Sequence, residues 1–493
     1  MKLLKIHPAD TVAVALGAIA PGEGIPLDGA VITVIEAVHA GHKVALQPIA
    51  AGEAVIKYGN PIGHVICDIS AGQTVHVHNL KTGLDSLLEY VYTPALTDLP
   101  AREPGTFMGY RRPGGKVGIR NEVWIIPAVG CVNIQATLLE KAAQSFLTDE
   151  IDGLYAFPHP YGCSQLGEDH AHTRRALTGM IQHPNAAGVL VLGLGCENNT
   201  VEGMREILGD YDTDRVKFLV CQDVSDELEA GLDLLKELIA FSGKFKREPV
   251  PMSELIVGLK CGGSDGFSGI TANPLVGAFT DRLIAEGGSA ILTEVPEMFG
   301  AETILMNRCR TPELFDQTVA LINDFKTYFI KNEQTIYENP SPGNKAGGIS
   351  TLEDKSLGCI QKGGVSDVAD VLGYAEPVTT KGLNLLSGPG NDLVSISNMT
   401  ASGAHLILFT TGLGTPFGAP VPTVKISSNT PLFEKKRGWI DFDAGPLLTG
   451  VSMDTLQNEL YEFVRALASG ERISKNEELG ARELTIFKTG VTL

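Results

Sequence analysis

The sequence predicts a multidomain α/β protein that begins with a small all-β domain, and three observations support this prediction. The chain has 493 residues, which exceeds the size at which one hydrophobic core stops growing, so we expect about two to four domains. Short apolar runs broken by glycine fill its N-terminal part, as is typical of short strands. Longer apolar runs then alternate with helical patterns, which predicts parallel strands joined by helices.

The first predicted element is an all-β domain over residues 1–92. It contains the short runs TVAVAL, AVITVIEAV, HKVALQPI, AVIKYG, HVICDI and TVHVHNL. Alternating runs of this length favour half-buried strands over helices. Residues 93–115 then carry four prolines and little periodicity, which predicts a linker out of this domain.

Two α/β domains are predicted next, over residues 116–245 and 250–493. In the first, the runs VWIIPAVG, GVLVLGLG and KFLVCQD alternate with the helical patterns CVNIQATLLEKAAQSFL and SDELEAGLDLLKELIAF. A break at SGKFKREPVPMS, residues 242–253, separates it from the second, which contains ELIVGLKCGG, SAILTEVPE, NLLSGP and HLILFTTG. We expect parallel sheets of the flavodoxin or Rossmann-like kind in both.

Composition argues against several classes of partner. Thirty-nine Lys and Arg against 58 Asp and Glu give a net charge of -19, which disfavours nucleic acids and anionic membranes. The start MKLLKIHPADTVAVALGAIA resembles a signal peptide, but His7, Pro8, Asp10 and Thr11 interrupt it and the remaining apolar run is too short for a membrane span. Eight dispersed cysteines do not form a disulfide pattern. We therefore expect reduced thiols and a cytoplasmic location.

Cysteines follow several predicted strands. Cys131 follows WIIPAVG, Cys196 follows VLVLGLG and Cys261 follows LIVGLK, and Cys163 lies in HPYGCSQLGEDH. Ligands of open α/β sheets bind at the carboxyl ends of strands, so these thiols are candidates to bind iron or a cluster. A single cysteine is more often a small buried apolar residue. The spacings match no compact cluster pattern, which makes an iron-sulfur cluster the less favoured alternative.

His76 and His78 lie two residues apart in AGQTVHVHNL. In a strand this spacing would aim both rings to one face, with Val75 and Val77 packed behind. Two nitrogen ligands are part of what a mononuclear metal site needs, and Asn79 would add an amide for substrate hydroxyls. Two solvated histidines on a surface strand are the alternative.

The remaining candidates are charged or amide side chains that would hold a carboxylate or transfer protons. Arginine suits a carboxylate because of its planar fork, although a solvated linker would also carry these residues. Glu197 and Asp265 follow strand-end cysteines closely and are candidates for acid or base, or else cap a helix. Candidates for substrate binding are Arg111, Arg112, Arg120, Asn121, Lys57 and Lys345, the last in the loop at residues 339–356.

Several segments together resemble the altronate and galactarate dehydratase family along the whole chain. They are KYGNPIGH, HVHN, GIRNEVWIIPAVGCVN, HPYGCSQLGEDH, LGLGCENN, CGGSDGFSGITANP, LTEVPEMFGAE, ENPSPGNKAGGISTLEDKSLGC, WIDFDAG and FKTGVTL. They occur in family order with no block missing. The opening KIHPADTVAVAL and the closing FKTGVTL favour the altronate branch, although galactarate dehydratase shares many blocks.

The resemblance implies a hydro-lyase that converts D-altronate to 2-dehydro-3-deoxy-D-gluconate in galacturonate breakdown. It also implies ferrous iron as the activating metal, manganese as a substitute, and an SAF-type β-clip domain at the N-terminus. The rest of the chain is α/β in this family. The residues that lie in matching blocks are His76, His78, Asn79, Cys131, Cys163, Cys196 and Cys261.

Dehydration of a 2,3-dihydroxy acid removes a weakly acidic proton beside a carboxylate and expels hydroxide from the next carbon. The doubly charged enolate must be neutralised by a metal or by cations, and a positioned base must take the proton. We expect His76 and His78 to act as metal ligands, or as a ligand and a base, with Lys57, Glu197 and Asp265 as further catalytic candidates.

Three alternatives remain open at this point. A relative acting on galactarate or a sulfonated hydroxy acid would share the metal and differ at the far end of the substrate. An iron-sulfur dehydratase would carry a coloured, oxygen-sensitive cluster. A sugar-acid-binding module would bind the ligand without turnover. In every case we expect a small-molecule ligand and a homo-oligomer, with no nucleic acid or membrane partner.

Overall fold

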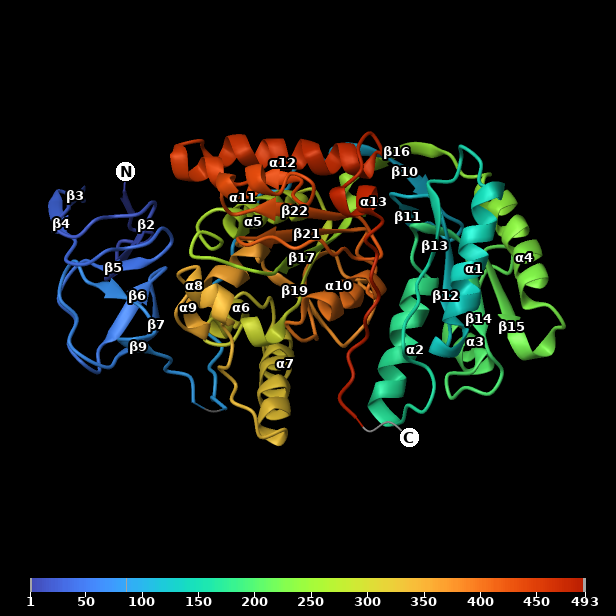
Figure 1. The fold of residues 1–493 in the computed structure, drawn as a ribbon, viewed down its shortest axis with the longest axis horizontal. Coiled ribbons are helices and arrows are strands. Elements are labelled where there is room, and N and C mark those ends of the chain that lie inside the picture. Colours follow the sequence, from blue (N-terminus) through green and yellow to red (C-terminus); the bar gives the residue numbers. More distant parts are fainter. Residues whose placement is uncertain (1, 86, 491–493) are drawn as a thin grey trace.

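The computed structural model describes residues 2–85 and 87–490, so the last three residues of FKTGVTL lie outside it. Figure 1 shows three bodies in a row: a β domain at one end, the C-terminal α/β domain in the middle and the second domain at the other end. The chain therefore runs from the N-terminal domain past the position of the middle domain, forms the second domain at the far end, and then returns to form the C-terminal domain in the middle. This confirms a multidomain α/β protein with an N-terminal β domain.

The N-terminal domain is built from short antiparallel strands. The order β1-β2-β5-β8 forms one sheet, β6-β7-β9 a second and β3-β4 a third. A small core forms around Ala13, Ile25 and Val44. β2 and β5 are buried on both faces rather than half-buried as predicted. The bounds are β1 Leu3–Leu4, β2 Val12–Ala15, β3 Gly24–Leu27, β4 Ala30–Thr33, β5 Lys43–Ala45, β6 Ala54–Lys57, β7 Asn60–Val65, β8 Thr74–Val75 and β9 Leu80–Lys81.

The predicted linker at residues 93–115 is only partly irregular. Residues 93–105 run without regular structure along the C-terminal domain, and the backbone N–H of Arg102 donates to the carbonyl of Ala285 at 2.8 Å. Residues 106–111 form a strand instead, β10 (Thr106–Arg111), which pairs with β11 (Val117–Gly118) and β16 (Arg247–Pro251). The segment that enters the second domain thus pairs with the segment that leaves it, a long-range contact that local periodicity does not reveal.

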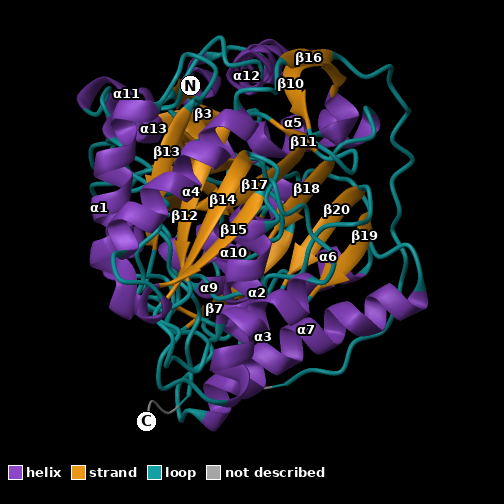
Figure 2. Cartoon of the chain, turned by 90° about the vertical axis from the view of Figure 1, so that its right-hand side faces the viewer, coloured by secondary structure: helices purple, strands orange, loops and turns teal. Residues whose placement is uncertain are grey.

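The second domain is a four-stranded parallel sheet in the order β13-β12-β14-β15. Every residue of β12 and β14 is buried, as expected of parallel strands covered on both faces. Figure 2 views the chain from this end and shows α1 and α4 along the strands. The bounds are β12 Glu122–Pro127, α1 Asn133–Ala143, β13 Gly153–Ala156, α2 Gly167–Ile181, β14 Ala186–Gly193, α3 Val201–Leu208, β15 Val216–Val220 and α4 Glu227–Ser242.

The C-terminal domain holds a seven-stranded parallel sheet in the order β19-β20-β18-β17-β21-β22-β23. Its strands are β17 Ile256–Cys261, β18 Ser289–Leu292, β19 Val368–Leu372, β20 Gly382–Leu386, β21 Leu406–Thr411, β22 Thr423–Ser427 and β23 Phe442–Asp443. Its helices are α5 Ala272–Ala285, α6 Glu302–Met306, α7 Pro312–Lys331, α8 Pro342–Ala346, α9 Leu352–Cys359, α10 Asp392–Ala401, α11 Thr430–Lys435, α12 Met453–Ala468 and α13 Lys475–Leu479.

Helix contacts join the two α/β domains. α2 crosses α10 closely at Gly179, where a Cβ atom would lie 2.1 Å from the carbonyl oxygen of Ala401. A side chain at this position would push the helices apart, so glycine is required for the crossing. Among residues 2–85 and 87–490, no helix combines the length and apolar character that crossing a membrane requires.

Candidate functional site

The C-terminal domain buries a dense set of ionisable side chains at the carboxyl edge of its sheet. Lys260 and Cys261 end the central strand β17, and Glu294 comes two residues after the neighbouring strand β18. Glu297 ends a short 3-10 helix at Val295–Glu297, and Lys362 lies in another at Ile360–Gly363. All five side chains are buried. This is the edge at which ligands of open α/β sheets bind.

Each ammonium group in this set has a carboxylate partner. Lys260 pairs with Glu294 and also with Asp392, the latter at 2.8 Å. Lys362 Nζ lies 3.3 Å from Glu294, and Lys355 Nζ lies 2.8 Å from Glu297. Buried ion pairs are costly to desolvate and often add little stability. Such a concentration of them therefore indicates a chemical role.

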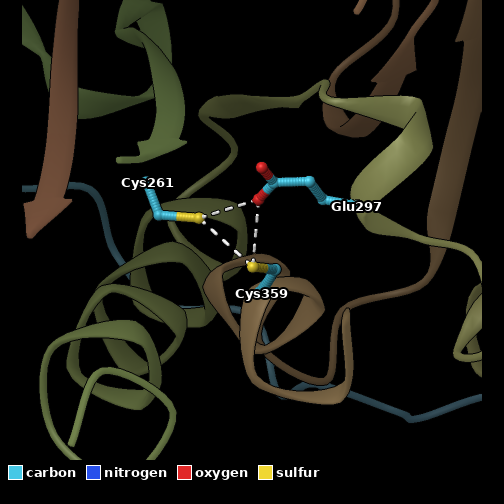
Figure 3. A group of neighbouring side chains, drawn as sticks. All are labelled: Cys261, Glu297 and Cys359. Atoms are coloured by element: carbon cyan, nitrogen blue, oxygen red, sulfur yellow. Dashed lines mark hydrogen bonds between the residues drawn. The ribbon is translucent and has the colours of Figure 1, made fainter. Parts of the chain in front are cut away.

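Three atoms that could bind a metal converge within the set. Cys261 Sγ lies 3.3 Å from Cys359 Sγ and 3.5 Å from Glu297 Oε2, and Cys359 Sγ lies 3.2 Å from the same oxygen (Figure 3). Among the described residues they form the one group of three such ligands within 4.8 Å of one another. Two thiols and a carboxylate suit a borderline divalent ion such as Fe²⁺, so the donor set fits iron.

The pKa values of Glu294 and Glu297 are shifted in opposite directions. Burial raises the pKa of Glu294 despite the nearby Lys260 and Lys362. Burial also disfavours ionised Glu297, but the ammonium groups, that of Lys355 foremost, lower its pKa to about 2. Glu297 is therefore a carboxylate that attracts cations, while Glu294 holds a proton more readily. Carboxyl groups whose pKa values are pushed apart are the usual arrangement for an acid and a base.

The N-terminal domain covers this region and adds two cations to it. Lys43 of β5 and Lys57 of β6 each reach a different carboxylate oxygen of Asp354, at 2.8 Å, and all three side chains are buried. Lys43 also donates to the carbonyl of Gly348 at 2.7 Å. Burial disfavours the charged form of Asp354, but the two lysines hold the pKa of Asp354 well below its usual range. Burial lowers the pKa of Lys43 to about 8.

Histidines line the same contact between domains. The ring nitrogen Nε2 of His76 lies 2.8 Å from the carbonyl oxygen of Lys345, and the rings of His76 and His42 are 4.9 Å apart. Since a carbonyl only accepts, Nε2 carries the hydrogen and Nδ1 keeps its lone pair. Nδ1 is buried with no hydrogen-bond partner in the described chain. Burial, aided by Lys43 and His42, lowers the pKa of His76 to about 4, so the ring is neutral at pH 7.

The enclosed space between the domains is small. A cavity of about 10 Å³ is lined by Lys57, Asp265, Lys355 and Cys359 among others. A void of that size holds at most about one water molecule. The cavity in this arrangement is therefore too small for a ligand of several carbon atoms.

The predicted histidine pair has a different geometry from the one expected. β8 ends at Val75, and residues 76–79 form a turn. Val77 is exposed rather than packed behind the rings, and His78 is exposed as well. The prediction of a shared strand face is wrong because Asn79 accepts from the N–H of His76 at 2.9 Å and closes the turn. Only His76 lies at the domain contact.

The arginines predicted to bind substrate do not share one surface. Arg111 is exposed and pairs with Glu248 at 2.8 Å. Arg112 is buried and donates to Asn121 and to two carbonyls, and Arg120 is buried against Glu477 at 2.7 Å. Asn121 itself bonds two backbone carbonyls. These residues tie the connections between domains together and lie outside the lining of the interdomain cavity.

The other predicted residues divide between the two sheets. Asp265 lines the cavity, accepts from Ser428 at 2.8 Å, and has a pKa raised by burial. Lys345 contributes its backbone carbonyl to His76. Glu197 accepts from two backbone N–H groups of its own loop, those of Leu194 and Gly195. The thiols of Cys131, Cys163 and Cys196 are exposed in the second domain, whereas Cys261 is buried at the end of β17 in the C-terminal domain.

Sequence reasoning missed most of the ionised set. The residues not singled out there are Lys43, Lys260, Glu294, Glu297, Asp354 and Lys362. A detectable pattern existed, because lysine or glutamate interrupts an apolar run in HKVAL, IVGLKC and AILTEV. A charge inside a buried strand or just after it is rare without a partner, and inspection of strand ends would have found Glu294.

Comparison with known proteins covers the whole chain. Residues 252–492 match the family model "D-galactarate/Altronate dehydratase, C-terminal", residues 109–241 match "D-galactarate dehydratase/Altronate hydrolase, second domain", and residues 1–83 match "Altronate/galactarate dehydratase SAF domain". The chain is 54% identical to the altronate dehydratase of Bacillus subtilis over 99% of both chains, and 53% identical to that of Escherichia coli over 100% of both. It is 31% identical to the L-threo-forming galactarate dehydratase of Escherichia coli, over 98% of this chain and 96% of that one.

Proposed function

The chain belongs to the altronate and galactarate dehydratase family, and from this premise we propose that it removes water from D-altronate to give 2-dehydro-3-deoxy-D-gluconate in galacturonate breakdown. The observation that carries the proposal is the full-length identity of 54% and 53% to two altronate dehydratases, against 31% to a galactarate dehydratase. The altronate branch is therefore favoured over galactarate. The enzyme class is a hydro-lyase.

The buried ionic set supplies what this reaction needs. Its five ammonium groups offer positive charge to a substrate carboxylate. A developing enolate dianion is stabilised by such fixed charges in a site that excludes water. The ammonium groups are those of Lys43, Lys57, Lys260, Lys355 and Lys362, and the carboxylates are those of Glu294, Glu297, Asp354 and Asp392.

Ferrous iron, with manganese as a substitute, would be held by Cys261, Glu297 and Cys359. When bound, it supplies positive charge for the substrate carboxylate and hydroxyl. The thiols must lose their protons to bind, and the ammonium group of Lys362 lies 2.9 Å from Cys261 Sγ. Support for iron comes from the donor chemistry and from the convergence of the three atoms.

Proton transfer is assigned to residues at the domain contact. His76 offers a neutral ring nitrogen, Nδ1, with no competing partner among the described residues, which is what a general base requires. Asp265, whose pKa burial raises, is the candidate to protonate the departing hydroxyl. Lys57 and Lys345 remain candidates for holding the substrate. His78, Asn79, Glu197 and the arginines stay predictions without support from this geometry.

The substrate assignment is tested by turnover under anaerobic conditions with added Fe²⁺ and thiol. D-altronate, galactarate and a sulfonated hydroxy acid are supplied separately, and the 2-keto product is measured. We expect product from D-altronate at a kcat/KM at least about tenfold above that for the other two. Faster turnover of galactarate would overturn the assignment. Calorimetric binding of altronate without product would indicate a binding module instead.

Three further properties are proposals of the same kind. We propose a cytoplasmic enzyme that works as a homo-oligomer, in line with the dispersed reduced thiols. The order β13-β12-β14-β15 corresponds to the flavodoxin-like order without its last strand. The C-terminal sheet would then be a Rossmann-like variant in which β20 is inserted between β19 and β18.

A further inference from the structure

The carboxyl edge of the second domain's sheet gathers three exposed thiols that the proposed reaction does not use. Cys131 follows β12, Cys163 lies in the loop after β13, and Cys196 lies in the loop after β14. All three side chains are exposed. Free cysteine is among the most frequently buried residue types, so three exposed thiols from three successive strand ends are unusual.

The three loops meet at one point of the backbone, Gly162. Its backbone has φ +97°, and a Cβ there would lie 2.2 Å from the carbonyl oxygen of Ala128 and 2.8 Å from Cα of Val129. Its carbonyl accepts from the N–H of Asn199 at 3.0 Å. Only glycine lets the loops after β12, β13 and β14 approach so closely.

Each thiol lies within three residues of this junction. Cys163 is adjacent to Gly162, Cys131 is two residues past Val129, and Cys196 is three residues before Asn199. Two or three residues of chain span at most about 7 to 11 Å. The Cα atoms of all three cysteines therefore lie within about 11 Å of this junction, close enough for their side chains to converge on a single multinuclear group.

Hydrogen bonds fix the loops that carry the thiols. The N–H of Ser164 donates to Asn198 Oδ1 at 2.7 Å, which ties the Cys163 loop to the Cys196 loop. The N–H of Gly130 donates to the carbonyl of Tyr161 at 2.8 Å, which ties in the Cys131 loop. Glu197 accepts from the N–H groups of Leu194 and Gly195 and holds the turn before it. The positions of the thiols are thus set by the protein before any ligand arrives.

The spacing distinguishes between kinds of metal site. The three sulfur atoms do not form a group within 4.8 Å of one another, since the described residues contain one such group and it lies in the other domain. A single ion needs its ligand atoms at that closer range. A cubane places each thiolate on a different iron, so its sulfur ligands stand farther apart.

We propose that Cys131, Cys163 and Cys196 hold a [4Fe–4S] cluster at the carboxyl edge of the second domain's sheet, with the fourth iron free of a protein ligand. This site is separate from Cys261, Glu297 and Cys359 and does not depend on the substrate assigned above. An iron without a protein ligand is open to an oxygen atom of water or of a hydroxy acid. The exposure of the thiols makes the cluster sensitive to oxygen.

Assembly of the cluster needs no oxidant or reductant when iron is supplied in both states. Two ferrous ions, two ferric ions and four sulfide ions form a core of charge +2, and each thiol releases its proton to solvent as its sulfur binds iron. The test therefore uses equal amounts of ferrous and ferric ions with sulfide, without oxygen. The protein is the full chain, cleared of metal by a chelator.

The first measurement compares reconstituted variants with a matched control. We expect the wild type to gain visible absorbance, about four acid-labile sulfides and about five irons per chain, four of them in the cluster and one at Cys261, Glu297 and Cys359. C131S, C163S and C196S should each lose most of that absorbance and sulfide. C67S, which alters an exposed thiol of the N-terminal domain, should keep both, as should C261S.

The second measurement does not depend on the folding of any variant. Native wild type is treated with iodoacetamide before and after reconstitution, and the labelled thiols are identified by mass spectrometry. The cluster should protect Cys131, Cys163 and Cys196 and leave Cys67 reactive. The proposal is overturned if the wild type takes up no sulfide, or if C67S loses as much as the other three variants, or if protection does not fall on these thiols.

Discussion

The two parallel sheets carry cysteines at the same structural position and surround them in opposite ways. At the end of β17, Cys261 is 1% exposed and lies 2.9 Å from an ammonium group. At the ends of β12 and β14, Cys131 and Cys196 are exposed. The difference comes from what covers the edge. The N-terminal domain closes over the first edge (Figure 1), with Lys43 and Lys57 bonded to Asp354.

This contrast shows that topology supplies a location while the covering elements supply the chemistry. A buried thiol beside a cation and a carboxylate suits a single ion and charge stabilisation in a dry site. An exposed thiol on a loop suits a multinuclear group open to solvent. The rule that ligands bind at the carboxyl ends of parallel strands thus finds the sites of both sheets but does not distinguish their chemistry.

The largest loss of stability is expected from removing the carboxylate of Asp354, which holds the N-terminal domain (the cover) over the edge of the sheet. Asp354→Asn leaves Lys43 and Lys57 buried without a counter-charge, and breaking a buried ion pair in this way costs about 3 to 5 kcal/mol. We expect the free energy of unfolding in urea to fall by that amount. E248Q, which breaks the surface pair with Arg111, should cost less than about 1 kcal/mol. Equal losses in the two variants would contradict the role given to the cover.

The next effect concerns the chemistry beneath the cover. Glu297→Gln keeps the shape but removes a carboxylate that touches both thiols and Lys355. Because Glu297 is one of the three proposed iron ligands, iron content should fall, and kcat should fall with it by about 10²-fold. E168Q, at an exposed position of α2, should leave both unchanged. Turnover of the Glu297 variant within tenfold of the wild type would place the reaction elsewhere.

Much of the architecture was predictable because hydrophobic patterning is local. The buried runs AAGVLVLG and LILFTT gave β14 and β21, and the alternation in TVAVAL gave β2. The strand β10 escaped prediction because its partner β16 comes from the other connection between domains, far along the chain. Pairing of that kind depends on tertiary structure rather than on the sequence of the strand.

The site was predictable only in part. Cys261 was found because it ends a strand, whereas Glu297 and Lys362 lie in short 3-10 helices that have no strong periodicity. The turn at residues 76–79 was missed because Asn79 closes it through its side chain, and such a bond competes with a strand. The bridge from Lys43 to Asp354 spans 311 residues of sequence, so no local pattern could reveal it.

The smallest effect is a pH dependence confined to the covered edge. His76 has a pKa of about 4 in the folded protein against an ordinary value of 6.5. As pH falls from about 6.5 to about 4, the unfolded chain binds this proton and the folded chain does not, so stability is lost across that window. The ring is only partly buried, so we discount the full shift to about 1 to 2 kcal/mol.

The measurement is the difference in unfolding free energy between wild type and H76Q, taken at several pH values. Because H76Q lacks this titration, the advantage of the wild type should shrink by about 1 to 2 kcal/mol between pH 6.5 and pH 4. Titration of His42 and Asp354, which face the same contact, occurs in both proteins and cancels in the difference. H78Q, which alters an exposed residue of the same turn, is the matched control. A slope of equal size in both variants would mean that the covering contact does not control the ionisation of His76.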